Sequence, residues 1–202
     1  MEKNNHLYRL LSSPLLYSLS QKIMSATTFR KKIVEKLIKR KNSYILDIGC
    51  GPAEILENLK EVHYYGFDVN KNYINFAKKK YKDKGIFRCT KFNSKKIDKK
   101  IKFDYILLLG LLHHLDDKQS SFLISEIKKV LKKNGVLLTL DNIYIKNQNI
   151  IAKKLIDLDR GKNVRSKSQY INILNKNFKH IKSRIYNQKF IPYTWYVAKC
   201  SS

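Results

Sequence analysis

The strongest chemical signal in the sequence is a glycine turn between an apolar run and a helical stretch, residues 45–56, ILDIGCGPAEIL. Gly49 and Gly51 let the backbone bend sharply and let a ligand lie directly against the peptide plane. The start of the following helix offers backbone N–H groups to a ligand. A glycine pair alone is a weak signal, but a pair between a strand and a helix is typical of a cofactor-binding turn.

The charges around this turn predict which ligand it binds. A dinucleotide-binding turn has a third glycine where this sequence has Glu54, and a carboxylate there repels a pyrophosphate. Asp47, two residues before Gly49, suits a cationic ligand better than a phosphate. S-adenosyl-L-methionine meets both conditions, because it has an ammonium, a sulfonium and a single carboxylate. The alternative is a strand–helix turn that binds no ligand.

A second acidic side chain, Asp68, ends the next predicted strand, 17 residues after Gly51. A carboxylate at a strand end can accept hydrogen bonds from both ribose hydroxyls, each contributing on the order of 1.5–3 kcal/mol. Taken alone, such an aspartate is more often the N-cap of the following helix, here 71–82. The spacing from the glycine turn favours ribose binding.

Two neighbouring histidines, His113 and His114, follow the fourth predicted strand. One of them is a candidate general base, with His114 preferred, because imidazole titrates near neutral pH. Asp141, at the end of the fifth predicted strand, is the second catalytic candidate. The alternative is that one histidine packs against its own loop and orients it.

A charged loop with the pattern DRGxxVR lies between two predicted helices and contains Asp159, Arg160, Gly161 and Arg165. It holds two of the seven arginines in a chain whose other 35 basic residues are lysines. Arginine here favours a site that needs a planar donor, such as an acceptor carboxylate or phosphate. We therefore expect Arg160, Arg165 and Tyr170 to bind the substrate. The alternative is an Asp–Arg pair that holds the lid helix to the body.

These residues all follow strands or connect helices in an alternating pattern. Such alternation predicts βαβ units and a mainly parallel sheet, and two consecutive strands at the C-terminal end predict an antiparallel hairpin. The fold class is therefore α/β, with seven strands and additional N-terminal helices. The predicted strands are 44–48, 62–68, 86–90, 103–110, 136–141, 179–187 and 191–199, and the predicted helices are 53–60, 71–82, 118–133, 147–158 and 167–177.

We expect a single domain over residues 1–202, since no linker or internal repeat interrupts the chain. Its predicted parts are an N-terminal helical cap (1–42), a cofactor-binding core (43–145) and a segment of lid helices and the hairpin (146–202). Asn134-Gly135 is the predicted stop of the helix before the fifth strand.

The net charge of +26 is the most unusual compositional feature. A surface this basic attracts nucleic acid, an anionic membrane or an acidic substrate. Arginine is the residue that binds phosphate and guanine through two hydrogen bonds at once, but most of the charge here comes from lysine. A solvated lysine surface is therefore favoured over a nucleic-acid-binding surface.

The three cysteines, Cys50, Cys89 and Cys200, are widely spaced and have no partner histidines at metal-binding intervals, so we expect no metal site. The sequence shows no signal peptide and no apolar run approaching the roughly 20 residues that span a bilayer. Reduced thiols in a cytoplasmic protein without a membrane span are the expectation.

The combined motifs resemble those of class I S-adenosylmethionine-dependent methyltransferases. The resemblance covers residues 44–141 and rests on four pieces in the family's order: DIGCG (47–51), the strand ending at Asp68, FDYILLLGLLHHLDD (103–117) and LKKNGVLLTLD (131–141). No piece is specific by itself, but the combination is. The resemblance implies a Rossmann-like fold, the cofactor S-adenosyl-L-methionine and the product S-adenosyl-L-homocysteine.

A narrower likeness extends to both ends of the chain, through residues 10–24, 158–170 and 191–200. These segments are similar to a group of small bacterial methyltransferases often encoded among genes for surface polysaccharide or other secondary metabolism. By this resemblance, Tyr17 and Gln21 cap the cofactor site from an N-terminal helix.

The resemblance also implies which residues line the cofactor. The family usually has an aspartate after the third strand that binds the adenine amino group. Lys91 stands at that position here, and Asn93 is the expected substitute through its amide oxygen. The expected lining is Asp47, Gly49, Cys50, Gly51, Asp68, Val69, Asn93, Leu109, Gly110 and Leu111.

The predicted function is methyl transfer to oxygen or nitrogen of a small acceptor, sugar-derived or another metabolite, with an anionic acceptor as one option. One alternative is an RNA or DNA methyltransferase. The segment after the fourth strand, Leu109–Leu112, argues against it, because enzymes that methylate exocyclic base amines have Asn/Asp-Pro-Pro-Tyr there. Another alternative is a non-catalytic partner subunit with the same fold.

Overall fold

The computed structural model of this chain describes residues 26–159, 161–188 and 192–201. Three predicted site residues, Tyr17, Gln21 and Arg160, lie outside the described residues. The chain divides into two units, Met1–Lys91 and Phe92–Ser202, and each is described by itself. The predicted single domain over residues 1–202 stays a prediction.

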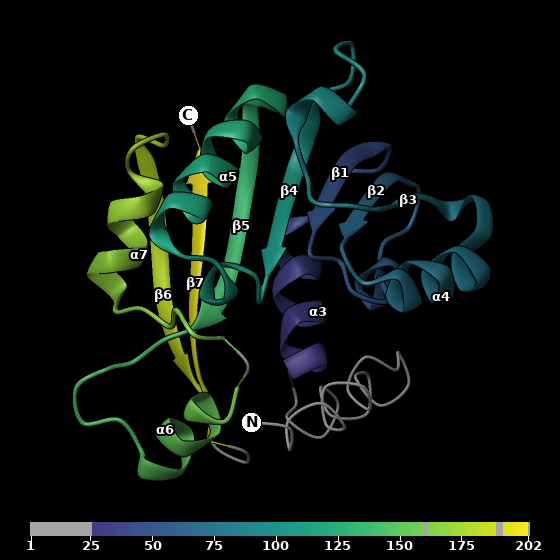
Figure 1. The fold of residues 1–202 in the computed structure, drawn as a ribbon. Helices are drawn as coiled ribbons and strands as arrows, with labels where there is room; N and C mark the ends of the chain where they lie inside the picture. The colour runs from purple at the N-terminus through teal and green to yellow at the C-terminus, as the bar shows by residue number, and fades with distance from the viewer. Residues whose placement is uncertain (1–25, 160, 189–191, 202) are drawn as a thin grey trace. The chain divides into compact units, whose positions relative to one another are not determined.

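The first unit is built on three parallel strands in the order β3-β2-β1 (Figure 1). Their inward side chains are apolar and buried, as expected of strands covered on both faces. Helix α4 packs against β2 and β3, and α3 contacts the short helix η1. The elements are α3 (Ala26–Leu37), β1 (Ser43–Ile48), η1 (Glu54–Asn58), β2 (Val62–Asp68), α4 (Lys71–Tyr81), η2 (Lys82–Lys84) and β3 (Gly85–Cys89).

The helix predicted at 53–60 is a 3₁₀ helix of five residues, η1, and not an α-helix. Its N-cap is Ala53, which has a positive φ of 58°. Gly49 and Gly51, with φ of 74° and 54°, precede it in the same left-handed region. Three left-handed residues so close together make a tight turn, and a short 3₁₀ helix continues such a turn more readily than a full α-helix.

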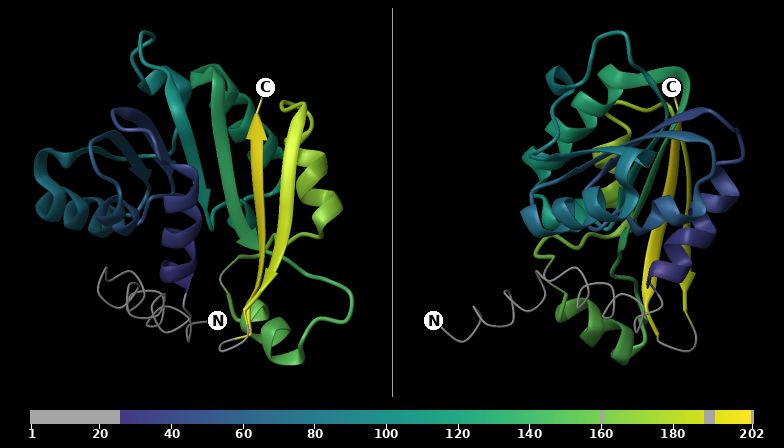
Figure 2. Two further views of the ribbon diagram at one scale, coloured as in Figure 1. Left: turned by 180° about the vertical axis from the view of Figure 1, so that it is seen from behind. Right: turned by 90° about the vertical axis from the view of Figure 1, so that its right-hand side faces the viewer.

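The second unit contains four strands in the order β4-β5-β7-β6, of which β4 and β5 are parallel and the other pairings antiparallel. Helices α5 and α7 contact each other and lie on one face of these strands (Figures 1 and 2). The elements are η3 (Ser94–Lys96), β4 (Phe103–Leu109), η4 (Leu112–His114), α5 (Asp117–Val130), β5 (Leu131–Asn142), α6 (Ile150–Asp157), α7 (Lys167–Leu174), β6 (His180–Asn187) and β7 (Thr194–Ser201).

The predicted helix stop at Asn134-Gly135 is wrong, because both residues lie inside β5. Helix α5 begins after the capping box of Asp116 and already ends at Val130. The register between β4 and β5 shifts after Phe103, and a Cβ on Gly135 would lie 2.9 Å from the Phe103 carbonyl oxygen. The glycine therefore allows a close backbone approach within the sheet.

The chain has the predicted Rossmann-like α/β fold, with seven strands among the described residues and an antiparallel pair, β6 and β7, at its C-terminal end. In the described part of the chain, no helix combines the length and the apolar composition that crossing a bilayer requires.

Candidate functional site

The glycine turn after β1 uses its backbone N–H groups within its own unit. Pro52 has no N–H, and the other four amides of residues 49–53 all donate to protein oxygens. A turn whose amides all have protein acceptors has no free N–H group to donate to the oxygens of a pyrophosphate. The four bonds are Gly49 N to Phe67 O (2.8 Å), Cys50 N to Phe67 O (3.1 Å), Gly51 N to Asp68 Oδ2 (2.9 Å) and Ala53 N to Cys50 O (2.9 Å).

Asp68 ends β2 with its carboxylate held in place by two backbone amides. Oδ2 accepts from Gly51 N at 2.9 Å and Oδ1 from Asn70 N at 2.8 Å. A carboxylate has about four lone-pair sites, so each oxygen can accept one more hydrogen bond. The N-cap of α4 is Asn70, whose side chain accepts from Asn72 N and Tyr73 N. Asp68 is therefore not the cap of this helix, which removes the structural alternative raised by the sequence.

Asp47, in β1 just before the turn, is a buried carboxyl with one unsatisfied oxygen. Its Oδ2 accepts a hydrogen bond of 2.7 Å from the Tyr64 hydroxyl, whereas its buried Oδ1 has no hydrogen-bond partner. Burial raises the pKa of Asp47 to about 7, although the bond from Tyr64 and the charge of Arg30 oppose this shift. A cationic donor or an ordered water would supply the hydrogen bond that Oδ1 lacks.

The other predicted cofactor residues of the first unit differ in exposure. The Cys50 side chain lies over the backbone of Gly66, where an added Cβ would be 2.9 Å from the Cys50 sulfur. Burial raises the pKa of the Cys50 thiol, so it stays neutral and acts as packing. Val69 follows Asp68 and is 64% exposed, which leaves an apolar side chain available at the strand end.

In the second unit, the chain turns after β4 at Gly110, which has a φ of 84° and donates from its N–H to Leu140 O at 2.6 Å. Leu109 is buried and Leu111 is half-buried. Asn93 is half-buried and caps η3, where its amide oxygen accepts the backbone N–H two residues further on at 2.9 Å. That oxygen, predicted to bind an adenine amino group, already has one partner.

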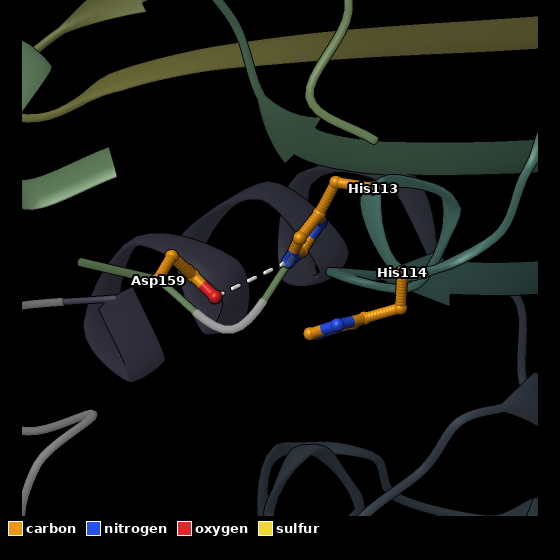
Figure 3. Close-up of side chains that lie close together, drawn as sticks. All are labelled: His113, His114 and Asp159. Atoms are coloured by element: carbon orange, nitrogen blue, oxygen red, sulfur yellow. Dashed lines mark ion pairs between the residues drawn. The ribbon is translucent and has the colours of Figure 1, made fainter. Parts of the chain in front are cut away.

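His113, in η4 at the end of β4, lies between two carboxylates. Its Nδ1 is 2.8 Å from Asp141 Oδ1, and its backbone N–H donates to the same oxygen at 3.2 Å. Its Nε2 is 3.7 Å from Asp159 Oδ1, the pair drawn in Figure 3. The second oxygen of Asp141 accepts from the Thr139 hydroxyl at 2.9 Å. Residues from β5 and from the loop after α6 thus fix the orientation of this imidazole.

The charges of this group favour a protonated His113. Burial alone lowers the pKa of His113, but the carboxylates of Asp141 and Asp159 outweigh it and raise the pKa to about 9. Burial likewise opposes ionisation of Asp159, yet His113 and the donors around it hold the pKa of that carboxyl well below its usual range. An imidazolium with both nitrogens directed at carboxylates cannot accept a proton from a substrate.

The two predicted catalytic residues are placed differently. His114 is exposed, and its ring centroid lies 4.2 Å from that of His113. Asp141 is fully buried, with both oxygens engaged by His113 and Thr139. Of the two, His114 alone is placed to contact an acceptor, and the geometry makes Asp141 a positioning residue for His113.

The geometry argues against the substrate-binding role predicted for Arg165 and Tyr170. Arg165 is buried and its guanidinium is used inside the protein. Tyr170 is fully buried, and its hydroxyl donates to Asn142 O at 2.9 Å. The contacts of Arg165 are the carbonyl oxygens of Leu112 (2.8 Å), Leu115 (2.6 Å) and Asn163 (3.1 Å) and the carboxylate of Asp117 (2.9 Å from Nε).

The loop that follows α6 packs directly on His113. A Cβ on Gly161 would lie only 2.0 Å from His113 Cδ2, and Asn163 N donates to His113 O at 2.9 Å. The carboxylate of Asp159 accepts at Oδ2 from Asn142 Nδ2 (2.9 Å) and from the Tyr193 hydroxyl (3.0 Å). No pattern in the sequence predicts that Asn142 and Tyr193 lie at a site, because both are distant from Asp159 along the chain.

Comparisons with known proteins agree with this arrangement of elements. Residues 46–137 match the family described as "Methyltransferase domain". No curated protein sequence gives a match.

Solved structures similar to this chain include several methyltransferases. Mitomycin 7-O-methyltransferase MmcR is 16% identical with a TM-score of 0.67, over 95% of this chain and 60% of that one. Human N-acetylserotonin methyltransferase, solved in complex with SAM, is 14% identical with a TM-score of 0.68, over 98% and 60%. A TehB-like SAM-dependent methyltransferase from Corynebacterium glutamicum is 13% identical with a TM-score of 0.60, over 94% and 97%. The chain spans about three fifths of the first two, and at these identities the likeness concerns the fold.

Proposed function

We propose that this chain, whose residues 46–137 match the methyltransferase-domain family, is a class I S-adenosylmethionine-dependent methyltransferase that methylates an oxygen or nitrogen atom of a small-molecule acceptor. The acceptor class includes sugar-derived and other metabolites. The proposal has a cofactor part, carried by the first unit, and an acceptor part, carried by groups of the second unit.

The observation that carries the cofactor part is the glycine turn whose amides are all used internally. Such a turn disfavours a dinucleotide, because a pyrophosphate binds through free amides. It is compatible with an adenosyl sulfonium, which brings positive charge to a region that already holds Asp47 and Asp68. The unsatisfied Oδ1 of Asp47 is consistent with a cationic neighbour.

The residues present fit the cofactor in chemical type. Asp68, oriented by Gly51 and Asn70, would accept the two ribose hydroxyls, and exposed Val69 would cover an apolar face of the adenosine. S-adenosyl-L-methionine supplies an already activated methyl group on sulfur. The protein's task is then mainly to hold the acceptor atom in line with that methyl, a contribution of roughly 7–11 kcal/mol.

The acceptor part rests on His114, the exposed residue of η4. His113 is committed to Asp141 and Asp159, and Arg165 to the loop carbonyls, so neither is available to an acceptor. A small acceptor agrees with the sequence Leu109–Leu112 at the end of β4, which differs from the Asn/Asp-Pro-Pro-Tyr motif of enzymes that methylate exocyclic base amines.

The cofactor part is tested by calorimetric titration of S-adenosyl-L-methionine and S-adenosyl-L-homocysteine into the protein and into Asp68→Ala. Losing two charge-assisted hydrogen bonds, about 1.5–3 kcal/mol each, should weaken binding by about 10²-fold or more. Asp83→Ala, which removes an exposed carboxylate of the same unit, is the matched control and should bind normally. Unchanged affinity in Asp68→Ala at an unchanged melting temperature would refute the assignment.

A nucleic-acid acceptor is the second candidate, and the net charge of +26 is the observation in its favour. Binding driven by phosphate contacts weakens steeply as salt rises from about 50 to 200 mM. An RNA or DNA that is methylated, and whose affinity falls in this way, would replace the small-molecule proposal. Flat and weak binding of nucleic acid over the same range supports a small acceptor.

A further inference from the structure

The turn after β4 and the loop after α6 bring three potential metal ligands together: His113, His114 and Asp159. One ligand atom from each lies within 4.8 Å of the other two, and the side chains of His113 and Asp159 point towards one another (Figure 3). A first-row metal ion binds such ligands at about 2.0–2.2 Å, which places neighbouring ligand atoms roughly 3–4 Å apart. The 3.7 Å between His113 Nε2 and Asp159 Oδ1 falls in that range.

His113 is already oriented as a metal-binding histidine would be. Such histidines almost always donate their other ring N–H to a carboxylate, a backbone carbonyl or a water, which fixes the tautomer and the ring direction. Here Nδ1 lies 2.8 Å from Asp141 Oδ1, and the Thr139 hydroxyl holds the second oxygen of Asp141. Nε2 is thereby directed at the cluster.

Asp159 is supported in the same way. Its Oδ2 accepts from the amide of Asn142 and from the hydroxyl of Tyr193, and its Oδ1, which also accepts from Gly161 N at 3.2 Å, faces His113. A carboxylate with one oxygen held by neighbours and the other turned to a cluster is the usual arrangement around a bound metal. Both sides of the cluster thus have supporting hydrogen bonds.

We propose that His113, His114 and Asp159 bind one divalent first-row transition-metal ion, with the remaining coordination positions open to solvent. Two imidazoles and one carboxylate suit Zn²⁺, Co²⁺, Ni²⁺, Mn²⁺ or Fe²⁺, whereas Mg²⁺ and Ca²⁺ prefer sites made of oxygen ligands. Binding exchanges the proton on His113 Nε2 for the ion, and the proton passes to solvent. His114 is exposed, so the open positions lie on the accessible side.

If the proposed methyl transfer is correct, the ion would also bind the acceptor oxygen and make it more acidic, the role that metal ions have in activating bound hydroxyls. This consequence rests on the proposed function. Metal binding itself does not depend on the proposed function, and it can be measured without enzymatic turnover.

The test is a Co²⁺ titration of chelator-treated protein, followed by visible absorption and by fluorescence of Trp195, the single tryptophan of the chain. Trp195 is a local reporter, because its ring lies 4.5 Å from that of Tyr193, which contacts Asp159. The titration is done in Cys89→Ser protein, which removes the exposed thiol as a competing ligand. We expect one equivalent to bind, with the spectrum of a nitrogen- and oxygen-ligated ion, and Zn²⁺ to displace it.

Variants locate the ion. His114→Gln should weaken Co²⁺ binding at least tenfold without affecting the fold, because the residue is exposed. Tyr193→Phe, which removes only the hydroxyl held by Asp159, should weaken it about tenfold, as changes to supporting partners do. His180→Gln, an exposed histidine on β6, is the matched control and should bind like the parent.

The proposal is overturned by absent binding, by several weak equivalents, or by equal affinity in the parent and His114→Gln. Its failure is distinguishable from that of the proposed function, because Asp68 and His114 lie in different units. Protein that binds no Co²⁺ but binds S-adenosyl-L-methionine rejects the metal site alone. Protein that binds Co²⁺ but loses no cofactor affinity in Asp68→Ala rejects the cofactor assignment alone.

Discussion

The glycine turn of the first unit and the His113 cluster of the second are organised in opposite ways. The turn is held by hydrogen bonds of its backbone amides, and the longest of them in sequence joins Gly49 to Phe67, 18 residues apart. The cluster is held by hydrogen bonds and ion pairs between side chains, and these side chains come from η4, β5, the loop after α6 and the segment before β7. A site made of backbone tolerates side-chain changes, whereas a site of buried charges depends on every partner.

The largest effect is expected from His113→Ala, which removes the central side chain of the buried cluster. This change leaves Asp141, which is fully buried, without its ion-pair partner. Removing one member of a buried pair costs about 3–5 kcal/mol, because the remaining charge is uncompensated. Urea unfolding should show a loss of this size. A loss below about 1 kcal/mol would mean that the cluster contributes little to stability, and Asp68→Ala, in the other unit, is the contrast.

A smaller effect is expected from Arg165→Met, which keeps the length of the side chain but removes its donors. The Leu112 and Leu115 carbonyls and Asp117 lose their partner, and hydrogen bonds to charged groups contribute about 1.5–3 kcal/mol. We expect the free energy of unfolding to fall by about 2–3 kcal/mol. Cofactor affinity should not change. A raised acceptor KM with unaltered stability would instead favour the substrate-binding role predicted from the sequence.

The smallest effect is expected near the glycine turn, at Glu57 in η1. Burial opposes ionisation of Glu57, but hydrogen bonds from Lys31 and Lys80 outweigh it and lower the pKa to about 2. Because the pKa of Glu57 is lower in the folded than in the unfolded protein, its ionised form stabilises the fold at pH values above the unfolded pKa of 4.5. This stabilisation is lost as the pH falls through the folded pKa of about 2. The group is 38% exposed, so solvent screening limits the contribution to less than about 1 kcal/mol.

Unfolding of Glu57→Gln and of the parent at a series of pH values checks this expectation. The parent should be slightly more stable at neutral pH, and the difference should shrink between pH 4.5 and about 2. Lys41, whose pair with Glu61 is 3.0 Å long and more exposed, offers a control in Lys41→Gln that should show almost no difference. A gap between Glu57→Gln and the parent that widens on acidification would contradict the assignment of the stabilising ion pairs.

Much of the fold could be predicted from the sequence because its signals are local. The apolar run at 44–48, the strand ending at Asp68 and the alternation that follows give β1, β2, α4 and β3 within one or two residues. One local prediction was wrong for a tertiary reason. Asn134-Gly135 is a good helix stop by composition, yet β5 already begins at Leu131, which pairs with Phe103 of β4, and both residues lie inside this strand.

The candidate site likewise contains residues whose partners are near in sequence and residues whose partners are distant. Gly49, Gly51 and Asp68 were identified from spacing, because the residues that hold one another there are close in sequence or in adjacent parallel strands. His113 and His114 are adjacent, and nothing along the chain shows which of the two is committed to a carboxylate. Burial distinguishes them, since His113 is buried between Asp141 and Asp159 and His114 is exposed.

The sequence by itself therefore determined the strand–helix alternation, the glycine turn and the acidic strand end, since backbone conformation and short-range hydrogen bonds depend on neighbouring residues. The tertiary structure alone decided that Arg165 serves loop carbonyls and that His113, His114 and Asp159 meet. Those contacts join residues about 45 to 53 positions apart, and only the folding of the chain brings such distant side chains within bonding distance.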